Sequence, residues 1–232
     1  MTDPYEIFVR WYLRMHGYLS VENFVIYEPR QATVPQGGEI DLLAVRFPFS
    51  RETPRPGFLL ELDPMLVDPA IDKEGLTDFV IAEVKSAKDS LNKLWRPPSS
   101  DVKLRRTEYI VRWLGFCHRE SVVSRVAKQL QAEREARLDR CRVRLLYFGP
   151  ANHPDVAKLR VPQFTYERLA EFVISPRASC YRDRGIADRS AHSQWHPLIQ
   201  AIWALADPAR TSDRKPEEIL EFLANEKAGA TT

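Results

Sequence analysis

The sequence has few cysteines, few glycines and no long apolar segment. Its three cysteines, Cys117, Cys141 and Cys180, are odd in number, far apart and outside any Cys-x-x-Cys pattern, which favours a reducing compartment over a disulfide framework. No apolar run approaches the roughly 18 residues that span a bilayer, and the first residues lack the basic and apolar regions of a secretory signal. We therefore expect a cytoplasmic protein with no membrane partner.

Motifs of two common enzyme classes are also missing. There is no Gly-x-x-x-x-Gly-Lys-[Ser/Thr], which argues against a P-loop NTPase, and no Gly-x-Ser-x-Gly, which argues against the usual serine hydrolases. The 17 prolines against nine glycines indicate defined loops rather than a low-complexity linker. With 44% hydrophobic and 28% charged residues in a chain of 232, the composition is typical of a globular protein with one sizeable core.

The net charge of +2 conceals an uneven distribution. Residues 1–102 carry 11 Lys and Arg against 16 Asp and Glu, whereas residues 103–144 carry 12 against 5. The basic segment has two interpretations: a solvated arginine-rich helix face, or a stripe that faces phosphates. A nearby chemical site would favour the second, so the small net charge does not exclude nucleic acid.

Hydrophobic periodicity predicts an α/β protein in one domain. An amphipathic helix is expected from Pro4 to about Gly17, with Asp3 as its N-cap. The other predicted helices span about 105–117, 120–138, 165–174, 194–206 and 216–226, and the predicted strands 23–27, 39–47, 78–85 and 142–149, with a further short strand at 58–62. We expect a core over residues 1–150, with an excursion at 48–77, and a helical C-terminal extension over 151–232 packed on the core.

Charged residues lie at the ends of two apolar strands. Asp41 is near the start of one predicted strand, and Glu83 and Lys85 end another. Because side chains alternate along a strand, positions 83 and 85 share a face, roughly 6–7 Å apart. Burying ionised groups costs several kcal/mol unless they are paired or bind a metal. The pattern indicates either a simple Glu–Lys pair at a strand end or a chemical site.

The order of these residues resembles the PD-(D/E)xK nuclease superfamily, which includes Holliday-junction resolvases and Mrr-type restriction enzymes. A helix carrying Glu6 precedes Gly37-Gly-Glu-Ile-Asp41, and Ile81-Ala-Glu83-Val-Lys85 follows. The resemblance covers about residues 5–90, extends loosely to Gly149, and implies a restriction-endonuclease-like core with a central mixed β-sheet flanked by helices. The chain departs from the family pattern in having Ile40 in place of the motif proline, and in the 41 residues between Asp41 and Glu83.

The resemblance also implies a chemistry. Asp41, Glu83 and the backbone carbonyl of Val84 would bind Mg²⁺ or Mn²⁺, hard cations that take oxygen ligands. Lys85 would orient the attacking water and offset charge on the phosphate, and Glu6 would act through a second metal or a bound water. We therefore expect a metal-dependent endo- or exonuclease, most simply one acting on DNA. The alternative is a catalytically silent nucleic-acid-binding or assembly subunit, and a homodimer or partner subunit fits either role.

Several assignments have competing interpretations. Glu61 or Asp63, in the long excursion, is the alternative to Asp41 as a ligand. Gln129 is either a site glutamine or an exposed helix residue. His192 and His196, with Cys180 upstream, lack the further ligands of a zinc site and read better as ordinary helix histidines. Adjacent Cys117 and His118 would point apart on a helix, which disfavours a thiol nucleophile.

Contacts to a nucleic-acid backbone are expected from the basic segment and from the arginines that follow the predicted helix at 165–174. Arginine suits this role because its guanidinium group binds phosphate in a bidentate manner. The predicted nucleic-acid-binding residues are Arg105, Arg106, Arg125, Lys128, Arg177, Arg182 and Arg184. The sequence leaves open DNA or RNA and the form of the substrate.

Overall fold

A mixed six-stranded β-sheet forms the centre of the protein in the computed structural model, which describes residues 3–26, 39–51, 60–87, 91–96, 100–115, 117, 119–178, 196–207 and 215–230. The strands are β1 (Leu19–Val25), β2 (Glu39–Arg46), β3 (Thr77–Val84), β4 (Glu135–Leu138), β5 (Cys141–Gly149) and β6 (Gln163–Thr165). They lie in the order β1-β2-β3-β5-β4, with β6 also paired to β5. The pairs β3–β5 and β5–β6 are parallel and the others antiparallel. This confirms the predicted α/β class and mixed sheet.

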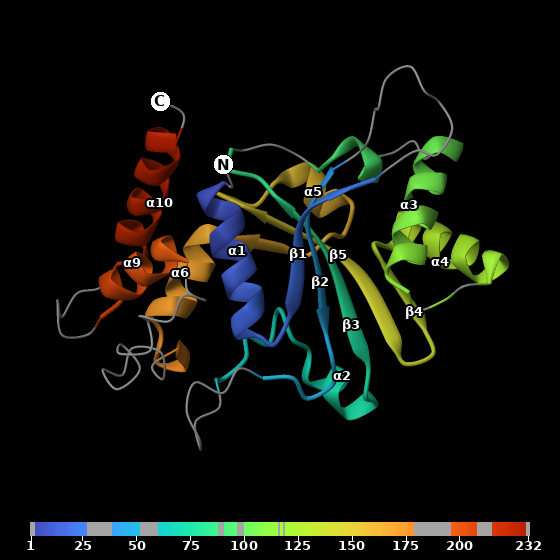
Figure 1. Ribbon diagram of the computed structural model, residues 1–232, viewed down its shortest axis with the longest axis horizontal. Helices are drawn as coiled ribbons and strands as arrows, with labels where there is room; N and C mark the ends of the chain where they lie inside the picture. Colours follow the sequence, from blue (N-terminus) through green and yellow to red (C-terminus); the bar gives the residue numbers. More distant parts are fainter. Residues whose placement is uncertain are drawn as a thin grey trace.

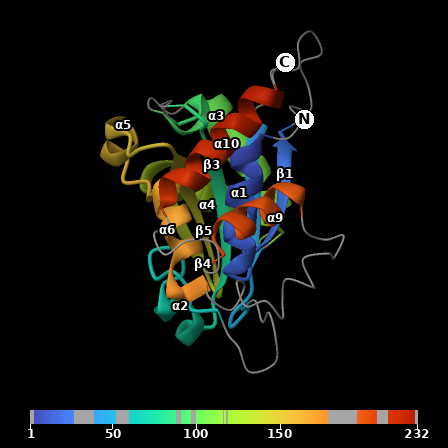
Figure 2. The same ribbon diagram turned by 90° about the vertical axis from the view of Figure 1, so that its left-hand side faces the viewer.

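Helices cover both faces of the sheet (Figure 1). One face is covered by α1 (Pro4–Met15), α6 (Tyr166–Ile174), α9 (Pro197–Leu205) and α10 (Pro216–Ala230), and the other by α3 (Asp101–Trp113) and α4 (Glu120–Glu133). Figure 2 shows α9 and α10 outside α1, where Trp11 of α1 meets Trp203 of α9 edge-on at 4.6 Å between ring centroids. Helix α9 therefore packs against α1 through this aromatic contact.

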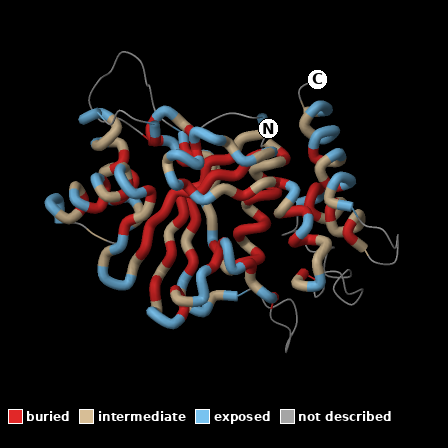
Figure 3. The backbone as a smooth tube through the Cα atoms, turned by 180° about the vertical axis from the view of Figure 1, so that it is seen from behind, coloured by how far each residue is buried: buried red, intermediate tan, exposed pale blue. Residues whose placement is uncertain are grey.

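Two hydrophobic clusters lie on opposite faces of the sheet. Leu42 and Ala82 pack toward α1, whereas Leu43 and Ile81 pack toward α3 and α4, because successive side chains of a strand point to opposite faces. The central strands are buried along most of their length (Figure 3). Continuous apolar runs are typical of strands covered on both faces, so any charged side chain here needs a partner.

The first helix begins where the sequence predicted it. Asp3 is the N-cap of α1, and its carboxylate accepts a hydrogen bond from the Tyr5 backbone N–H at 2.9 Å. Pro4 occupies the first turn, where its missing N–H costs no hydrogen bond. The helix starts at the same end of the sheet at which β3 ends (Figure 1), and this places Glu6 near the end of β3.

Three predictions about local structure were wrong. The helix predicted over 120–138 ends at Glu133, because Arg134 adopts a left-handed conformation with φ 66°, and strand β4 follows. No strand forms at residues 60–62, and residues 58 and 59 lie outside the described ranges. The C-terminal extension is not purely helical, since β6 joins the sheet beside β5.

Short elements went unrecognised in the sequence. These are α2 (Pro69–Glu74), α5 (Pro154–Lys158) and the 3₁₀ helices η1 (Lys93–Trp95) and η2 (Pro176–Ala178). Both α2 and α5 carry proline in the first turn after a capping side chain, Asp68 and His153 respectively. This start signal was therefore present, but each helix is too short to show a hydrophobic period.

None of the helices in the described ranges combines the length and the apolar character needed to cross a lipid bilayer.

Candidate active site at the ends of strands β2 and β3

Asp41 and Lys85 come together where β2 separates from β3. The ladder between these strands begins at Leu42 and Ala82, so Asp41 has no backbone partner on β3. Its Oδ2 instead accepts a hydrogen bond from the Val84 backbone N–H at 2.6 Å. Lys85 Nζ lies 3.3 Å from the same oxygen. The Asp41 side chain thus takes the place of a strand carbonyl and is held at the end of β3.

A break in strand alternation turns Asp41 toward this position. Ile40 and Leu43 pack in the same hydrophobic cluster although they are three residues apart, which regular alternation forbids. On the neighbouring strand, Glu22 pairs with Leu42 and Phe24 with Ile40. The residue opposite Asp41 is therefore Asn23, which has a positive φ of 51°. Both strands are irregular at this one level of the sheet.

Glu83 is a buried carboxylate whose two oxygens face different partners. Its side chain is 1% exposed, and Oε1 accepts a hydrogen bond from the Trp95 indole N–H at 3.2 Å. Lys85 Nζ lies 3.1 Å from Oε2 and forms an ion pair with it. Burial raises the pKa of Glu83 despite the opposing effect of Lys85, and nearby Asp41 raises it further.

Lys85 is the shared partner of the two carboxylates, Glu83 on β3 and Asp41 on β2. Burial by itself would lower the pKa of this ammonium group, but Glu83 and Asp41 outweigh it, and the pKa of Lys85 is raised. Lys85 therefore carries its charge at neutral pH. Its side chain remains 20% exposed, so it is accessible from solvent.

Glu6 approaches the same group from α1. Its pKa is raised to about 7, chiefly by burial and then by the charges of Asp41, Asp3 and Glu39, with Lys85 opposing. The structure thus brings all four residues of the predicted motif, from a helix and two strands, to one end of the sheet.

Two aromatic residues near the site were missed by sequence reasoning. Trp95 lies on η1 and donates its indole N–H to Glu83 Oε1 at 3.2 Å. Tyr166, the first residue of α6, donates its hydroxyl to the Lys85 backbone carbonyl at 2.9 Å and stacks on Tyr5 with ring centroids 4.5 Å apart. Neither residue belongs to a recognisable motif. In the sequence, Trp95 lies 12 positions from Glu83 and Tyr166 lies 81 positions from Lys85.

The C-terminal helix also reaches this end of the molecule. Lys227 Nζ of α10 lies 2.7 Å from Asp3 Oδ2 and contacts the hydroxyl of Ser86, the residue after Lys85. A second ammonium group is therefore anchored beside the site. The sequence held no local signal for this contact, because 224 positions separate Asp3 from Lys227.

The alternative ligands in the long excursion lie elsewhere. Asp63 is buried and accepts hydrogen bonds from Tyr12 Oη at 2.7 Å and Arg168 Nη2 at 2.8 Å. Glu61 is exposed and pairs with Arg177 at 3.2 Å. Both carboxylates have structural partners away from Lys85. Of the three candidate carboxylates, Asp41 is the one that lies beside Lys85.

The donor set suits a hard cation only in part. Across the described residues, no group of three or more His, Cys, Asp and Glu side chains has the arrangement of a metal site. The remaining candidate ligands are the carboxylates of Asp41 and Glu83 and the Val84 carbonyl, and both carboxylates contact Lys85. Mg²⁺ keeps several waters and binds through one or two carboxylates plus substrate phosphates. Asp41 and Glu83 are thus ligands of the kind that Mg²⁺ or Mn²⁺ takes, but Lys85 occupies the space between them in this structure.

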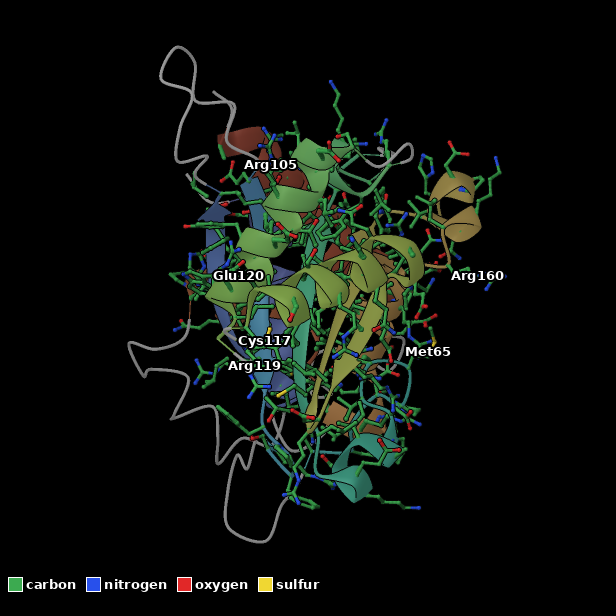
Figure 4. All side chains as sticks on the ribbon, turned by 90° about the vertical axis from the view of Figure 1, so that its right-hand side faces the viewer. Met65, Arg105, Cys117, Arg119, Glu120 and Arg160 are labelled. Carbon is green, nitrogen blue, oxygen red and sulfur yellow. The ribbon has the colours of Figure 1, made fainter. Side chains whose placement is uncertain are left out.

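The predicted nucleic-acid-binding residues are scattered. Arg105, Arg125 and Lys128 are exposed and Arg106 is half-buried, on α3 and α4; Figure 4 shows Arg105 on α3. Arg177 is engaged with Glu61. Arg182 and Arg184 lie outside the described residues.

Part of the basic segment is structural, not surface. Arg142 and Arg144 are buried on β5 and pair with buried Asp78 at 2.8 and 2.9 Å, respectively. The interpretation of residues 103–144 as one phosphate-facing stripe is therefore wrong for these two arginines. It remains a prediction for the exposed cations of α3 and α4.

The described residues give no support to a site role for Gln129, to a reactive Cys117 thiol or to a zinc site at His196. Gln129 donates to Glu133 at 2.9 Å on the surface of α4, whereas Gln131 points inward to the Thr107 hydroxyl. Burial raises the pKa of the Cys117 thiol, which disfavours a reactive thiolate. His196 caps α9 rather than lying inside a helix, and Cys180, His192 and His118 lie outside the described residues.

Comparisons with family models, with curated proteins and with solved structures each find no match for this chain.

Proposed function

We propose that this protein is a Mg²⁺- or Mn²⁺-dependent nuclease of PD-(D/E)xK type that hydrolyses phosphodiester bonds, with DNA as substrate. The observation that carries the proposal is the position of Lys85 Nζ, 3.3 Å from Asp41 Oδ2 and 3.1 Å from Glu83 Oε2. Two carboxylates and an ammonium group from adjacent strands converge at an accessible sheet end, and Glu6 supports them from α1. This grouping has the residue types that phosphodiester hydrolysis requires.

Each residue has a defined task in this proposal. A bound divalent cation would supply activation of water and compensation of phosphate charge. Asp41 and Glu83 would hold that cation, and the hydrogen bond from Val84 to Asp41 keeps the Asp41 carboxylate oriented. Lys85, freed from its carboxylates, would position the attacking water and stabilise the additional negative charge on the phosphate. With a pKa of about 7, Glu6 is suited to exchange a proton with water at neutral pH.

The test is cleavage by the purified full-length chain. Supercoiled plasmid, linear duplex DNA, single-stranded DNA and RNA are incubated with Mg²⁺ or Mn²⁺, or with a chelator. We expect metal-dependent cleavage of DNA that falls by about a hundredfold or more in Asp41→Asn and Lys85→Ala. Nicking of the closed plasmid identifies an endonuclease.

The matched controls make the same substitutions, Asp to Asn and Lys to Ala, at exposed residues away from the site. Asp139→Asn alters an exposed turn residue that already has a positive φ of 50°, and Lys73→Ala alters an exposed lysine at the end of α2. Both controls should cleave like wild type. Absence of cleavage under every condition, or cleavage that survives Asp41→Asn, contradicts the proposal. Salt-sensitive DNA binding without cleavage, unchanged by Lys85→Ala, would favour the silent binding subunit.

A further inference from the structure

A second polar feature lies away from the proposed active site, at the outer edge of β5. The N-terminal part of β5 pairs with β4 along this edge, and its C-terminal part pairs with β6. Between them, Leu145 N–H donates to the Arg134 carbonyl and Tyr147 N–H to the Pro162 carbonyl, at 2.9 and 3.0 Å. The sheet edge therefore splits at this level, and a cavity of about 740 Å³ opens at the split.

The cavity is strongly basic. Its walls come from the end of α4, the residue after η1 and the end of α5, and they carry four cations, Arg96, Arg134, Lys158 and Arg160. Glu133 is the one lining carboxylate, and it accepts a hydrogen bond from Gln129 at 2.9 Å. Asp155 pairs with the lining Lys158 at 2.9 Å, so four cations stand against two carboxylates, Glu133 and Asp155. The remaining positive excess around one concave site attracts anions, since such a site focuses the electrostatic field.

Arg134 is the unusual member of this group. It is 6% exposed, yet no carboxylate of the described ranges pairs with it, and its Nε is buried without a hydrogen-bond partner. Its Nη1 donates only to the Gln131 carbonyl in the last turn of α4. Buried arginine normally has an anionic partner because burying an uncompensated charge is costly, as Arg142 and Arg144 have in Asp78. Arg134 lacks that compensation and lines a cavity.

The exposed cations leave room for an external ligand. No hydrogen bond or ion pair joins the Arg160 side chain to another described residue, and Figure 4 shows Arg160 at the side of the molecule near α5. Arg96 Nε donates a hydrogen bond to the Leu91 backbone carbonyl at 2.6 Å, and Lys158 forms an ion pair with exposed Asp155 at 2.9 Å. Guanidinium groups in a concave site favour a tetrahedral oxyanion, above all phosphate.

We infer that this cavity, formed by Arg96, Arg134, Lys158 and Arg160, is a binding site for a phosphate group separate from the proposed active site. Glu83 on β3 pairs with Tyr147 on β5, and the cavity lies beyond β5, which places it about two strand spacings, or roughly 10 Å, from Glu83. Trp95 contacts Glu83 and its neighbour Arg96 lines the cavity. A nucleic-acid strand crossing η1 would place one of its phosphates in this cavity. That the phosphate belongs to a nucleic acid rests on the proposed function.

Binding is measured in chelator, so that no cleavage occurs and the result does not depend on nuclease activity. Inorganic phosphate is titrated into the full-length protein by calorimetry. We expect saturable binding that weakens by about tenfold or more in Arg160→Gln and in Arg134→Met, since one charge-assisted hydrogen bond contributes at least that much. Arg140→Gln, which removes an exposed arginine from the β4–β5 turn, is the matched control and should bind like wild type.

The variants separate binding from folding and from catalysis. Arg160 is exposed, so Arg160→Gln leaves the packing intact and keeps the test decisive even if Arg134→Met unfolds. Asp41→Asn should bind phosphate like wild type, which separates this site from the proposed metal ligands. If only a 5′-phosphorylated oligonucleotide displaces the bound phosphate, the site binds a strand terminus; if a 5′-hydroxyl oligonucleotide also displaces it, the site binds the strand backbone. If neither oligonucleotide displaces the bound phosphate, the site binds a free phosphate ligand. No binding to wild type, or equal binding by Arg160→Gln, overturns the inference.

Discussion

Lys85 Nζ lies 3.3 Å from Asp41 Oδ2, although the two residues are 44 positions apart in the sequence. The same ammonium lies 3.1 Å from Glu83 Oε2 and so occupies the space between the two carboxylates that we assign to the metal. Lysine and a divalent cation therefore compete for these oxygens. This competition gives the proposed site a signature that does not depend on cleavage.

Replacing Lys85 should tighten metal binding while it abolishes cleavage. In Lys85→Met the two carboxylates lose their counter-charge, so Mg²⁺ or Mn²⁺ no longer has to displace an ammonium group. We expect the metal to raise the thermal unfolding midpoint of this variant at lower concentrations than in wild type, as linkage requires for tighter binding to the folded state. Lys73→Ala should match wild type. A weaker metal response in Lys85→Met would contradict the competition.

The hydrogen bond from Trp95 to the buried Glu83 carboxylate should stabilise the fold. Trp95→Phe replaces the fully buried indole by a smaller phenyl ring and removes the N–H that donates to Glu83 Oε1 at 3.2 Å. We expect a loss of about 1–3 kcal/mol in the free energy of unfolding, because a buried acceptor is left unsatisfied, measured by urea denaturation at pH 8. Trp113→Phe is the control, since Trp113 is 47% exposed, and an equal loss in both variants would argue against a specific role.

Asp63 should matter for stability and not for chemistry. Asp63→Asn weakens the buried group formed with Tyr12 and Arg168, and we expect a cost of about 1–3 kcal/mol, the usual range for an imperfectly satisfied buried polar group. Cleavage per folded molecule should remain near wild type below the unfolding temperature, whereas Asp41→Asn should abolish it. Loss of cleavage in fully folded Asp63→Asn would restore Asp63 as a candidate ligand.

His16 should make the fold sensitive to mild acid. It is fully buried, and burial lowers its pKa from 6.5 to about 4. The folded protein therefore excludes a proton that the unfolded chain accepts, so stability is full above pH 6.5 and falls as the pH drops from 6.5 toward 4. The shift corresponds to about 2 kcal/mol lost between pH 7 and pH 5.

A non-titrating variant isolates this contribution. His16 Nδ1 lies 2.6 Å from the Tyr12 carbonyl, and the amide nitrogen of Asn in His16→Asn can replace that donor without titrating. Denaturation curves at pH 7 and pH 5 should show a smaller difference for His16→Asn than for wild type. An unchanged difference would place the acid sensitivity in other groups.

The exposed cations of α3 and α4 should contribute to DNA affinity in a salt-dependent way. If Arg105, Arg125 and Lys128 contact phosphates, each substitution by Gln reduces the slope of log affinity against log salt concentration by about one. Binding is measured in chelator by fluorescence anisotropy over a range of salt concentrations. Lys73→Gln should leave the slope unchanged, and identical slopes for all variants would remove α3 and α4 from the interface.

Sequence reasoning located the strongest elements because their signals are local. The Asp3–Pro4 start of α1 and the apolar runs of β2, β3 and β5 follow from capping and hydrophobic pattern alone. β4, β6 and the short helices escaped because three to six residues carry too little pattern. The end of α4 was placed too late, since a left-handed Arg134 has no distinctive sequence signal.

The sequence by itself identified the candidate residues: strand alternation placed Glu83 and Lys85 on one face, and the resemblance to the PD-(D/E)xK motif added Glu6 and Asp41. Only the tertiary structure decided what surrounds them. Trp95, Tyr166 and Lys227 reach the site through packing of η1, α6 and α10, and packing also divided the basic segment into buried ion pairs and exposed cations. The physical reason is that alternation and capping act between chain neighbours, whereas burial and charge pairing depend on contacts between residues distant in sequence.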